Sequence, residues 1–130
     1  MGLSFRCPVE PIPAPRMRVT MRGGRARAYP APKYAAWLRE AGGWFDEADG
    51  LPPAPLTTLL IVDVMCFIER PKTGKLKTPR GDVDNYLKPP LDAATNRVWV
   101  DDDQIVAASV TKEYLPHGTP GFFFLNVSEV

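Results

Sequence analysis

Residues 57–68 read Thr-Thr-Leu-Leu-Ile-Val-Asp-Val-Met-Cys-Phe-Ile. The run is almost entirely apolar or β-branched, and Asp63 carries its only charge. A strand that is apolar on both faces is typical of a central position in a sheet covered on both sides. We therefore expect a central, buried strand here, with Asp63 paired to a nearby arginine, and the rest of the domain arranged around it.

The chain before this strand contains a second strand and a loop. Residues 3–9 alternate apolar and polar side chains, which predicts a half-buried strand, and Pro8 favours an edge position. Residues 10–32 are rich in proline, arginine and glycine, with two glycines at 23–24. This composition predicts a flexible basic loop.

A helix is predicted to begin near Pro32, because apolar side chains between Tyr34 and Phe45 follow the helical i, i+3, i+4, i+7 spacing. Gly42 and Gly43 are expected to fray or end it, and its aromatic stripe is interpreted as core. Further on, the patterns predict a helix over 84–96, a short strand at 98–100, and an antiparallel hairpin formed by 105–114 and 122–127. The 130 residues therefore fit one α+β domain, with a mixed sheet of about four to five strands and two main helices.

The net charge is only +1, yet the charges are segregated along the chain. Residues 1–39 hold eight basic side chains and one acid, whereas residues 40–68 hold five acids and no base. Residues 70–80 are basic again, and residues 82–103 contain six aspartates. Basic borders around an acidic centre suit a protein that grips phosphates and holds a cation. A merely solvated surface gives the same pattern.

The composition excludes several classes of protein. His117 is the only histidine, so neither a structural zinc site nor a nuclease mechanism built on several histidines is expected. Cys7 and Cys66 lie in apolar segments and are interpreted as buried thiols in a reducing compartment. No apolar run approaches the roughly 18–20 residues that span a bilayer, and no signal peptide is recognised. We therefore expect no membrane association.

The acidic segment carries the pattern with chemical meaning. Asp82 and Asp84 are two residues apart, so in an extended segment both carboxylates face the same side. Such a pair can bind Mg²⁺, which prefers carboxylates, waters and phosphate oxygens. Lys88 follows one helical turn after Asp84, where it could steady a phosphate. The acids at 101–103 end the short strand after the helix and could complete the site.

Each of these features also has an ordinary structural explanation. Asp82 or Asp84 could be a helix N-cap, Lys88 and Asp92 a surface ion pair, and the triple aspartate a solvated turn. The prolines at 89–90 lie inside the predicted helix, where proline costs about 3 kcal/mol. Either the helix is kinked there, or the first turn is separate and the regular helix begins at Pro89. The second arrangement weakens the expectation that Asp84 and Lys88 share a face.

Together these residues resemble a known family. The string Asp82-x-Asp84-Asn85-x-x-Lys88-x-x-x-Asp92, followed by Trp99-Val100-Asp101-Asp102-x-Gln104 and a strand that carries Lys112, resembles the RusA-like Holliday-junction resolvases. These are small crossover-junction endodeoxyribonucleases of phages and prophages. Near the N-terminus, the family's basic region is similar to Pro15-Arg16-x-Arg18-x-Thr20 and to Tyr29, Lys33 and Tyr34. The resemblance runs from about Phe5 to Val127.

The resemblance implies a RusA-like fold, a homodimer, and Mg²⁺-dependent resolution of four-way DNA junctions by paired phosphodiester hydrolysis, with Mn²⁺ as a substitute ion. It assigns the metal to Asp82, Asp84 and Asp102 and the essential lysine to Lys88, with Asp101 as a fallback ligand. DNA backbones are expected to contact the basic side chains of two segments, namely Arg16, Arg18, Arg22, Arg25 and Arg27, and Lys72, Lys75, Lys77 and Arg80. The expected location is the cytoplasm of a bacterial cell, for a phage or prophage protein.

Three other functions remain open at this stage. The first is a less selective metal-dependent nuclease that acts on flaps, replication forks or RNA. The second is a junction-binding protein whose nuclease site is inactive. The third is an α+β interaction domain in which the aspartates are caps, and metal ions would then leave its thermal stability unchanged.

Overall fold

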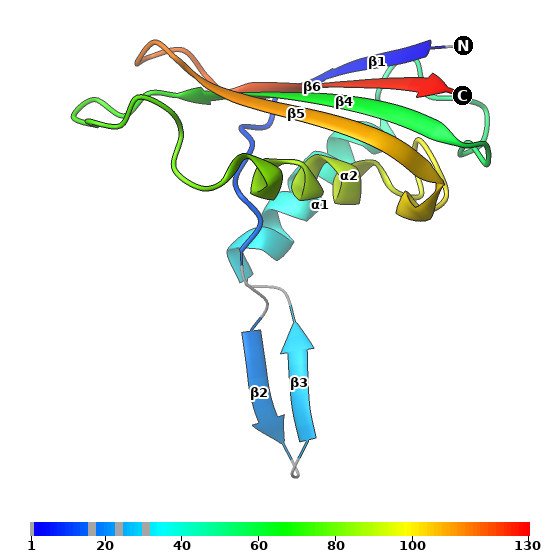
Figure 1. Ribbon diagram of the computed structural model, residues 1–130, viewed down its shortest axis with the longest axis horizontal. Coiled ribbons are helices and arrows are strands. Elements are labelled where there is room, and N and C mark those ends of the chain that lie inside the picture. The colour runs from blue at the N-terminus through cyan, green and yellow to red at the C-terminus, as the bar shows by residue number, and fades with distance from the viewer. Residues whose placement is uncertain (1, 16–17, 23–24, 30–31) are drawn as a thin grey trace.

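The computed structural model describes residues 2–15, 18–22, 25–29 and 32–130, with only the backbone described for 18–22 and 25–29. Figure 1 shows a sheet with two helices against one face and a separate two-stranded ribbon. The elements are, in chain order, β1 (Gly2–Cys7), β2 (Arg18–Arg22), β3 (Arg25–Tyr29), α1 (Pro32–Asp46), β4 (Leu60–Glu69), the 3-10 helix η1 (Val83–Tyr86), α2 (Lys88–Ala94), the 3-10 helix η2 (Asp102–Gln104), β5 (Ile105–Leu115) and β6 (Phe122–Glu129). This arrangement confirms the predicted α+β class.

The main sheet has four strands in the order β1-β6-β4-β5. β1 lies at an edge, as Pro8 predicted, and β4 lies at the centre. The predicted hairpin of the last two strands is wrong, because β4 separates β5 from β6. β5 pairs with β4 in parallel, whereas β6 is antiparallel to both β4 and β1. The apolar β4 takes the central position, and the largely exposed β5 is left at the edge.

Only one face of the sheet is covered, which corrects the expectation of a strand buried on both sides. Leu60, Val62, Val64 and Cys66 of β4 are buried, and α1 and α2 lie on their side of the sheet (Figure 1). On the other face Ile61 is 45% exposed. Phe67 of the same face is half-buried and stacks on Phe122 of β6. On this face the Asp63 carboxylate accepts a hydrogen bond from the Ser109 hydroxyl, and not from the expected arginine.

The segment predicted as a loop over 10–32 contains two strands. β2 and β3 pair antiparallel from Arg18 opposite Tyr29 to Arg22 opposite Arg25. In Figure 1 this ribbon extends away from the main sheet. Residues 18–22 and 25–29 alternate as short strands do, but the proline, arginine and glycine of the segment favoured the prediction of a loop. The two strands pair only with each other among the described residues.

Helix α1 begins at Pro32, as predicted, but the glycines do not end it, because it continues to Asp46. Tyr34, Trp37 and Phe45 are buried in the core, which confirms the interpretation of the aromatic stripe. Gly42 is buried beneath the Arg97 side chain, which leaves no room for a Cβ atom. This residue is therefore glycine because of close packing, and it does not terminate the helix.

Replacing Gly43 with alanine is expected to stabilise the protein by up to about 1 kcal/mol, because glycine is a poor helix former. A Cβ at Gly43 meets nothing within 4 Å, whereas a Cβ at Gly42 would lie 2.8 Å from the Arg97 Nη2 atom. Gly42→Ala is the matched control and should gain less. Urea denaturation measures both, and equal gains would contradict the packing argument.

Cys7 and Cys66 are free and buried, as predicted. Burial raises the pKa of the Cys7 thiol to about 11 and that of Cys66 to about 12. Both thiols are therefore protonated at neutral pH and serve as core side chains. Separately, none of the helices in the described part of the chain is long and apolar enough to cross a membrane.

Candidate active site

Asp82 and Asp84 lie on the exposed turn that begins η1, directly after the basic loop that follows β4: Asp82 is extended and precedes η1, and Asp84 lies within it. Asp82 occupies the N-cap position of η1, but its side chain makes no capping hydrogen bond. Among the described residues, no donor bonds to either carboxylate. The alternative of a plain N-cap is therefore wrong for Asp82, and both carboxylates remain available to a cation or solvent.

The predicted helix over 84–96 is two separate pieces. η1 ends at Tyr86, and α2 begins at Lys88 with Leu87 as its N-cap. Pro89 and Pro90 therefore fall in the first turn of α2, where the missing backbone N–H groups have no partner to lose. Asp84 and Lys88 consequently belong to different helices.

Lys88 forms the ordinary ion pair that its spacing allows. Its Nζ atom lies 2.9 and 3.2 Å from the two carboxylate oxygens of Asp92, and its side chain is 61% exposed. Asp92 also accepts a hydrogen bond from the Tyr34 hydroxyl at 2.5 Å, which joins α2 to α1. Burial, the bond to Asp92 and the negative charges of Asp92 and Asp102 raise the pKa of Tyr34. The hydroxyl therefore stays protonated and donates to Asp92.

Asp102 is half-buried and held in one orientation. Its Oδ1 atom accepts hydrogen bonds from Trp99 Nε1 at 3.0 Å and from the Thr95 hydroxyl at 2.7 Å. The same hydroxyl lies 2.8 Å from the Leu91 carbonyl oxygen and shares its single proton between the two acceptors. No described residue donates to the Oδ2 atom, so this oxygen is free to take a ligand.

The neighbours of Asp102 have structural roles. Asp101 caps η2, where its carboxylate accepts the Asp103 N–H in a capping box with Gln104. The buried Gln104 side chain bonds the backbone of residues 100–101 and the segment at 56–58. The strand predicted at 98–100 is replaced by isolated bridges at Trp99 to Leu56 and Thr95.

The three predicted metal ligands are not gathered into one cluster. Within the described residues, no group of three or more His, Cys, Asp or Glu side chains could hold a metal ion. Asp92 bonds the Tyr34 hydroxyl, and the charge of Asp102 acts on the same hydroxyl, whereas Asp82 and Asp84 lie on the exposed turn. The available donors nevertheless suit Mg²⁺, which usually takes one or two protein carboxylates and completes its shell with waters and substrate phosphates.

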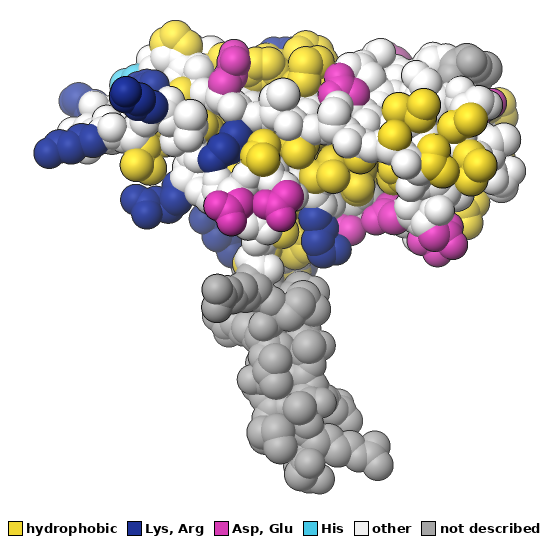
Figure 2. All heavy atoms as spheres, in the orientation of Figure 1, with side chains coloured by type: hydrophobic (Ala, Val, Ile, Leu, Met, Phe, Trp, Pro, Cys, Tyr) yellow, Lys and Arg dark blue, Asp and Glu magenta, His cyan; other side chains and the backbone are white. Residues whose placement is uncertain are grey.

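The basic side chains expected to contact DNA fall into two groups. Figure 2 shows Lys and Arg side chains gathered over the loop after β4, with acidic side chains nearby over the short helices. All four predicted residues of this loop are exposed, namely Lys72, Lys75, Lys77 and Arg80. Arg18, Arg22, Arg25 and Arg27 lie on β2 and β3, with side chains outside the described part, and Arg16 lies outside the described residues.

Sequence reasoning overlooked the residues that hold these acids. Tyr34 was interpreted as core, and Thr95 and Trp99 were given no role at the site. The signal in the sequence was that Trp99 and Thr95, which can donate hydrogen bonds, lie three and seven residues before Asp102. Lys112 belonged to the resemblance pattern without a role, and its Nζ atom bonds the backbone just before Asp82.

The fold and site define a small α+β domain that presents carboxylates beside a cationic loop. The family model described as "Endodeoxyribonuclease RusA" matches residues 8–121. The chain therefore belongs to the RusA family of endodeoxyribonucleases, which confirms the resemblance. No curated protein matches it.

Proposed function

We propose that the protein is a Mg²⁺-dependent endodeoxyribonuclease that resolves Holliday junctions and related branched DNA by paired hydrolysis of phosphodiester bonds. The observation that carries the proposal is the free carboxylate pair of Asp82 and Asp84, on an exposed turn next to a cationic loop. Capping or ion pairing would occupy these side chains, and neither does so among the described residues. In an endodeoxyribonuclease family, a metal ion is the partner that such a pair suits.

Asp82, Asp84 and the free Oδ2 atom of Asp102 are the proposed metal ligands. When bound, the ion would lower the pKa of a water molecule and neutralise charge on the phosphate. Thr95 and Trp99 orient Asp102, and this support is expected of residues around a metal ligand. Mn²⁺ is expected to replace Mg²⁺.

Lys88 is proposed to steady the charge that develops on the phosphate. In the structure its ammonium pairs with Asp92 at a well-exposed position. Exposed pairs of this kind contribute only about 0–1 kcal/mol. Lys88 can therefore exchange Asp92 for a phosphate oxygen with little loss of stability.

The remaining basic side chains are proposed to follow the DNA backbones, which gives affinity and little sequence preference. They are the exposed cations of the loop after β4 and the arginines of the first basic segment, including those on β2 and β3. We place this reaction in the cytoplasm of a bacterial cell, and we propose that the protein is encoded by a phage or prophage.

A homodimer is proposed because resolution needs two opposed cuts, which a twofold pair of identical sites supplies. The open face of the main sheet offers an apolar surface for such an interface. It carries Ile61 and Phe67 on β4 and Phe122 and Phe124 on β6. Sedimentation of the purified protein at several concentrations measures the oligomeric state.

The first test uses a labelled four-way junction and a linear duplex of the same sequence, each incubated with Mg²⁺, with Mn²⁺ and with EDTA. We expect paired nicks on opposite strands of the junction in either metal and none in EDTA. Equal cutting of the linear duplex would instead identify a less selective nuclease.

Binding of the junction without cutting would support the second candidate, a junction-binding protein with an inactive site. One observation favours this candidate, namely that no three acidic, histidine or cysteine side chains among the described residues are placed to hold a metal ion. Cutting in Mg²⁺ would reject it and would imply that metal and DNA bring the acids together.

A further inference from the structure

The backbone immediately before Asp82 is held at three consecutive carbonyl oxygens. Lys112 Nζ donates to the Pro79 oxygen at 2.6 Å and to the Gly81 oxygen. The Tyr86 hydroxyl donates to the Arg80 oxygen, which lies between them, at 2.6 Å. No carbonyl of the segment 79–81 is left free, so its peptide planes are fixed up to the bond that leads into Asp82.

The two donors come from rigid parts of the molecule on either side of the segment. Lys112 lies on β5, opposite Cys66 of the central strand. Tyr86 ends η1 and is buried, and its own carbonyl oxygen accepts the Cys66 thiol at 3.7 Å. These contacts join the turn that bears Asp82 to the sheet.

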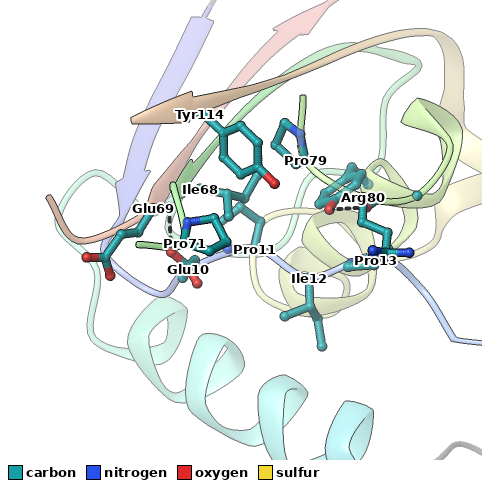
Figure 3. A pocket seen from close by; sticks show the side chains of 12 residues that line it. Glu10, Pro11, Ile12, Pro13, Ile68, Glu69, Pro71, Pro79, Arg80 and Tyr114 are labelled. Carbon is teal, nitrogen blue, oxygen red and sulfur yellow. Dashed lines mark hydrogen bonds between the residues drawn. The ribbon is translucent and has the colours of Figure 1, made fainter. Parts of the chain in front are cut away.

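Packing fixes only the first residue of this segment, because Pro79 is buried whereas Arg80 and Gly81 are exposed. The segment borders a pocket of about 320 Å³, whose wall includes Pro79, Arg80 and Tyr114 (Figure 3). It also borders a hollow of about 280 Å³, which Asp82 and Lys112 line. At Arg80 and Gly81, hydrogen bonds therefore supply the rigidity that burial supplies at Pro79.

The environment of Lys112 is unusual for a lysine. Its side chain is half-buried, and no carboxylate lies within ion-pair distance among the described residues. A partly buried charge is unfavourable unless it is well hydrogen-bonded, and here backbone carbonyls provide the bonds. Gly81 has φ of +101°, a conformation that side chains disfavour, so the turn is also conformationally specific.

We propose that Lys112 and Tyr86 are positioning residues that fix Asp82 by holding the carbonyl oxygens of residues 79–81. The inference rests on the proposed function, in which Asp82 binds the metal. Partners that orient metal ligands are commonly worth roughly 10–100-fold in metal affinity or activity. Loss of the Lys112 contacts should therefore weaken metal binding without removing any ligand.

The test compares Lys112→Met, which keeps the length of the side chain, with Lys112→Arg, which keeps a donor, and with Tyr86→Phe, which removes one hydroxyl. Tyr114→Phe is the matched control, because no described residue bonds its hydroxyl.

Metal affinity is measured from the rise in melting temperature with Mn²⁺, and from the Mg²⁺ concentration that gives half-maximal cleavage. Lys112→Met should raise that concentration roughly 10–100-fold, and saturating Mg²⁺ should restore most of the maximal rate. Tyr86→Phe should have a smaller effect, Lys112→Arg should recover part of the loss, and Tyr114→Phe should match the wild type.

A second measurement does not depend on catalysis. Hydrogen exchange of the metal-free protein reports the mobility of residues 79–84, which should exchange faster in Lys112→Met and Tyr86→Phe than in Tyr114→Phe. Unchanged exchange and unchanged metal affinity in the first two variants would overturn the proposal and leave the nuclease assignment intact. If the wild type neither binds metal nor cuts DNA, the proposed function fails. Faster exchange would then still support the positioning role, and unchanged exchange would reject it.

Discussion

Replacing Asp82 with asparagine is expected to lower the rate of junction cleavage by about 1000-fold or more, while junction binding stays near the wild-type level. A bound ion stabilises charge in the transition state by several kcal/mol, and each 1.4 kcal/mol is a factor of ten in rate. Asparagine keeps the shape of the side chain and removes the charge that holds the ion. Single-turnover cleavage in Mg²⁺ measures the rate, and a gel-shift assay in EDTA measures binding.

Asp103→Asn is the matched control for this experiment. It removes the same charge from an exposed carboxylate in the neighbouring acidic cluster, and no described residue donates to that side chain. Cleavage near the wild-type rate is expected. An Asp82→Asn variant that cuts as fast as the Asp103→Asn variant would show that Asp82 holds no essential ion.

Replacing Gln104 with leucine is expected to destabilise the fold by about 2–4 kcal/mol, because buried polar groups lose their partners. The Gln104 amide nitrogen donates to the carbonyl oxygens of Leu56 and Thr58, and its oxygen accepts from the backbone N–H groups of Val100 and Asp101. Leu56 and Val100 also bond each other, so they retain a partner. The Asp101 N–H and the Thr58 oxygen would be left without one among the described residues.

Chemical denaturation measures the free energy of unfolding for this variant. Glu47→Leu, which introduces the same side chain at an exposed position, should change it by less than about 0.5 kcal/mol. Because Gln104 ends η2, which begins at Asp102, cleavage should also fall in Gln104→Leu at temperatures where the protein remains folded. Equal stabilities of the two variants would show that Gln104 does not hold this region.

Local patterns were sufficient for elements whose burial follows their own sequence. Alternation in residues 3–9 and the apolar run at 57–68 predicted β1 and β4, and the aromatic spacing predicted α1. Side-chain periodicity is a property of a single element, so these predictions needed no knowledge of neighbours. The same holds for the prolines at 89–90, whose backbone chemistry separates η1 from α2.

The predictions that failed depend on partners distant in the sequence. Consecutive strands often pair, which led to the predicted hairpin of β5 and β6. In the structure β4 lies between them and pairs with both. β4 is apolar on both faces, yet only one is covered, because both helices pack on the same side (Figure 1). The two strands within 10–32 are the exception, because β2 and β3 pair with each other across residues 23–24. Both alternate, but the proline, arginine and glycine of the segment favoured the prediction of a loop.

The sequence by itself determined the class of the domain, its family and the aspartates that are candidate metal ligands, because these depend on residue types and their spacing. Tertiary structure decided which of these acids are held in place. The cap at Asp101 and the pairing of Asp92 with Lys88 are local, but the Tyr34 hydroxyl reaches Asp92 from α1. The fold of the segment between α2 and η2 brings Thr95 and Trp99 to one oxygen of Asp102, whereas no described residue donates to Asp82 or Asp84. Identical aspartates acquire different roles because the role depends on the donors within hydrogen-bond reach, and folding decides which donors these are.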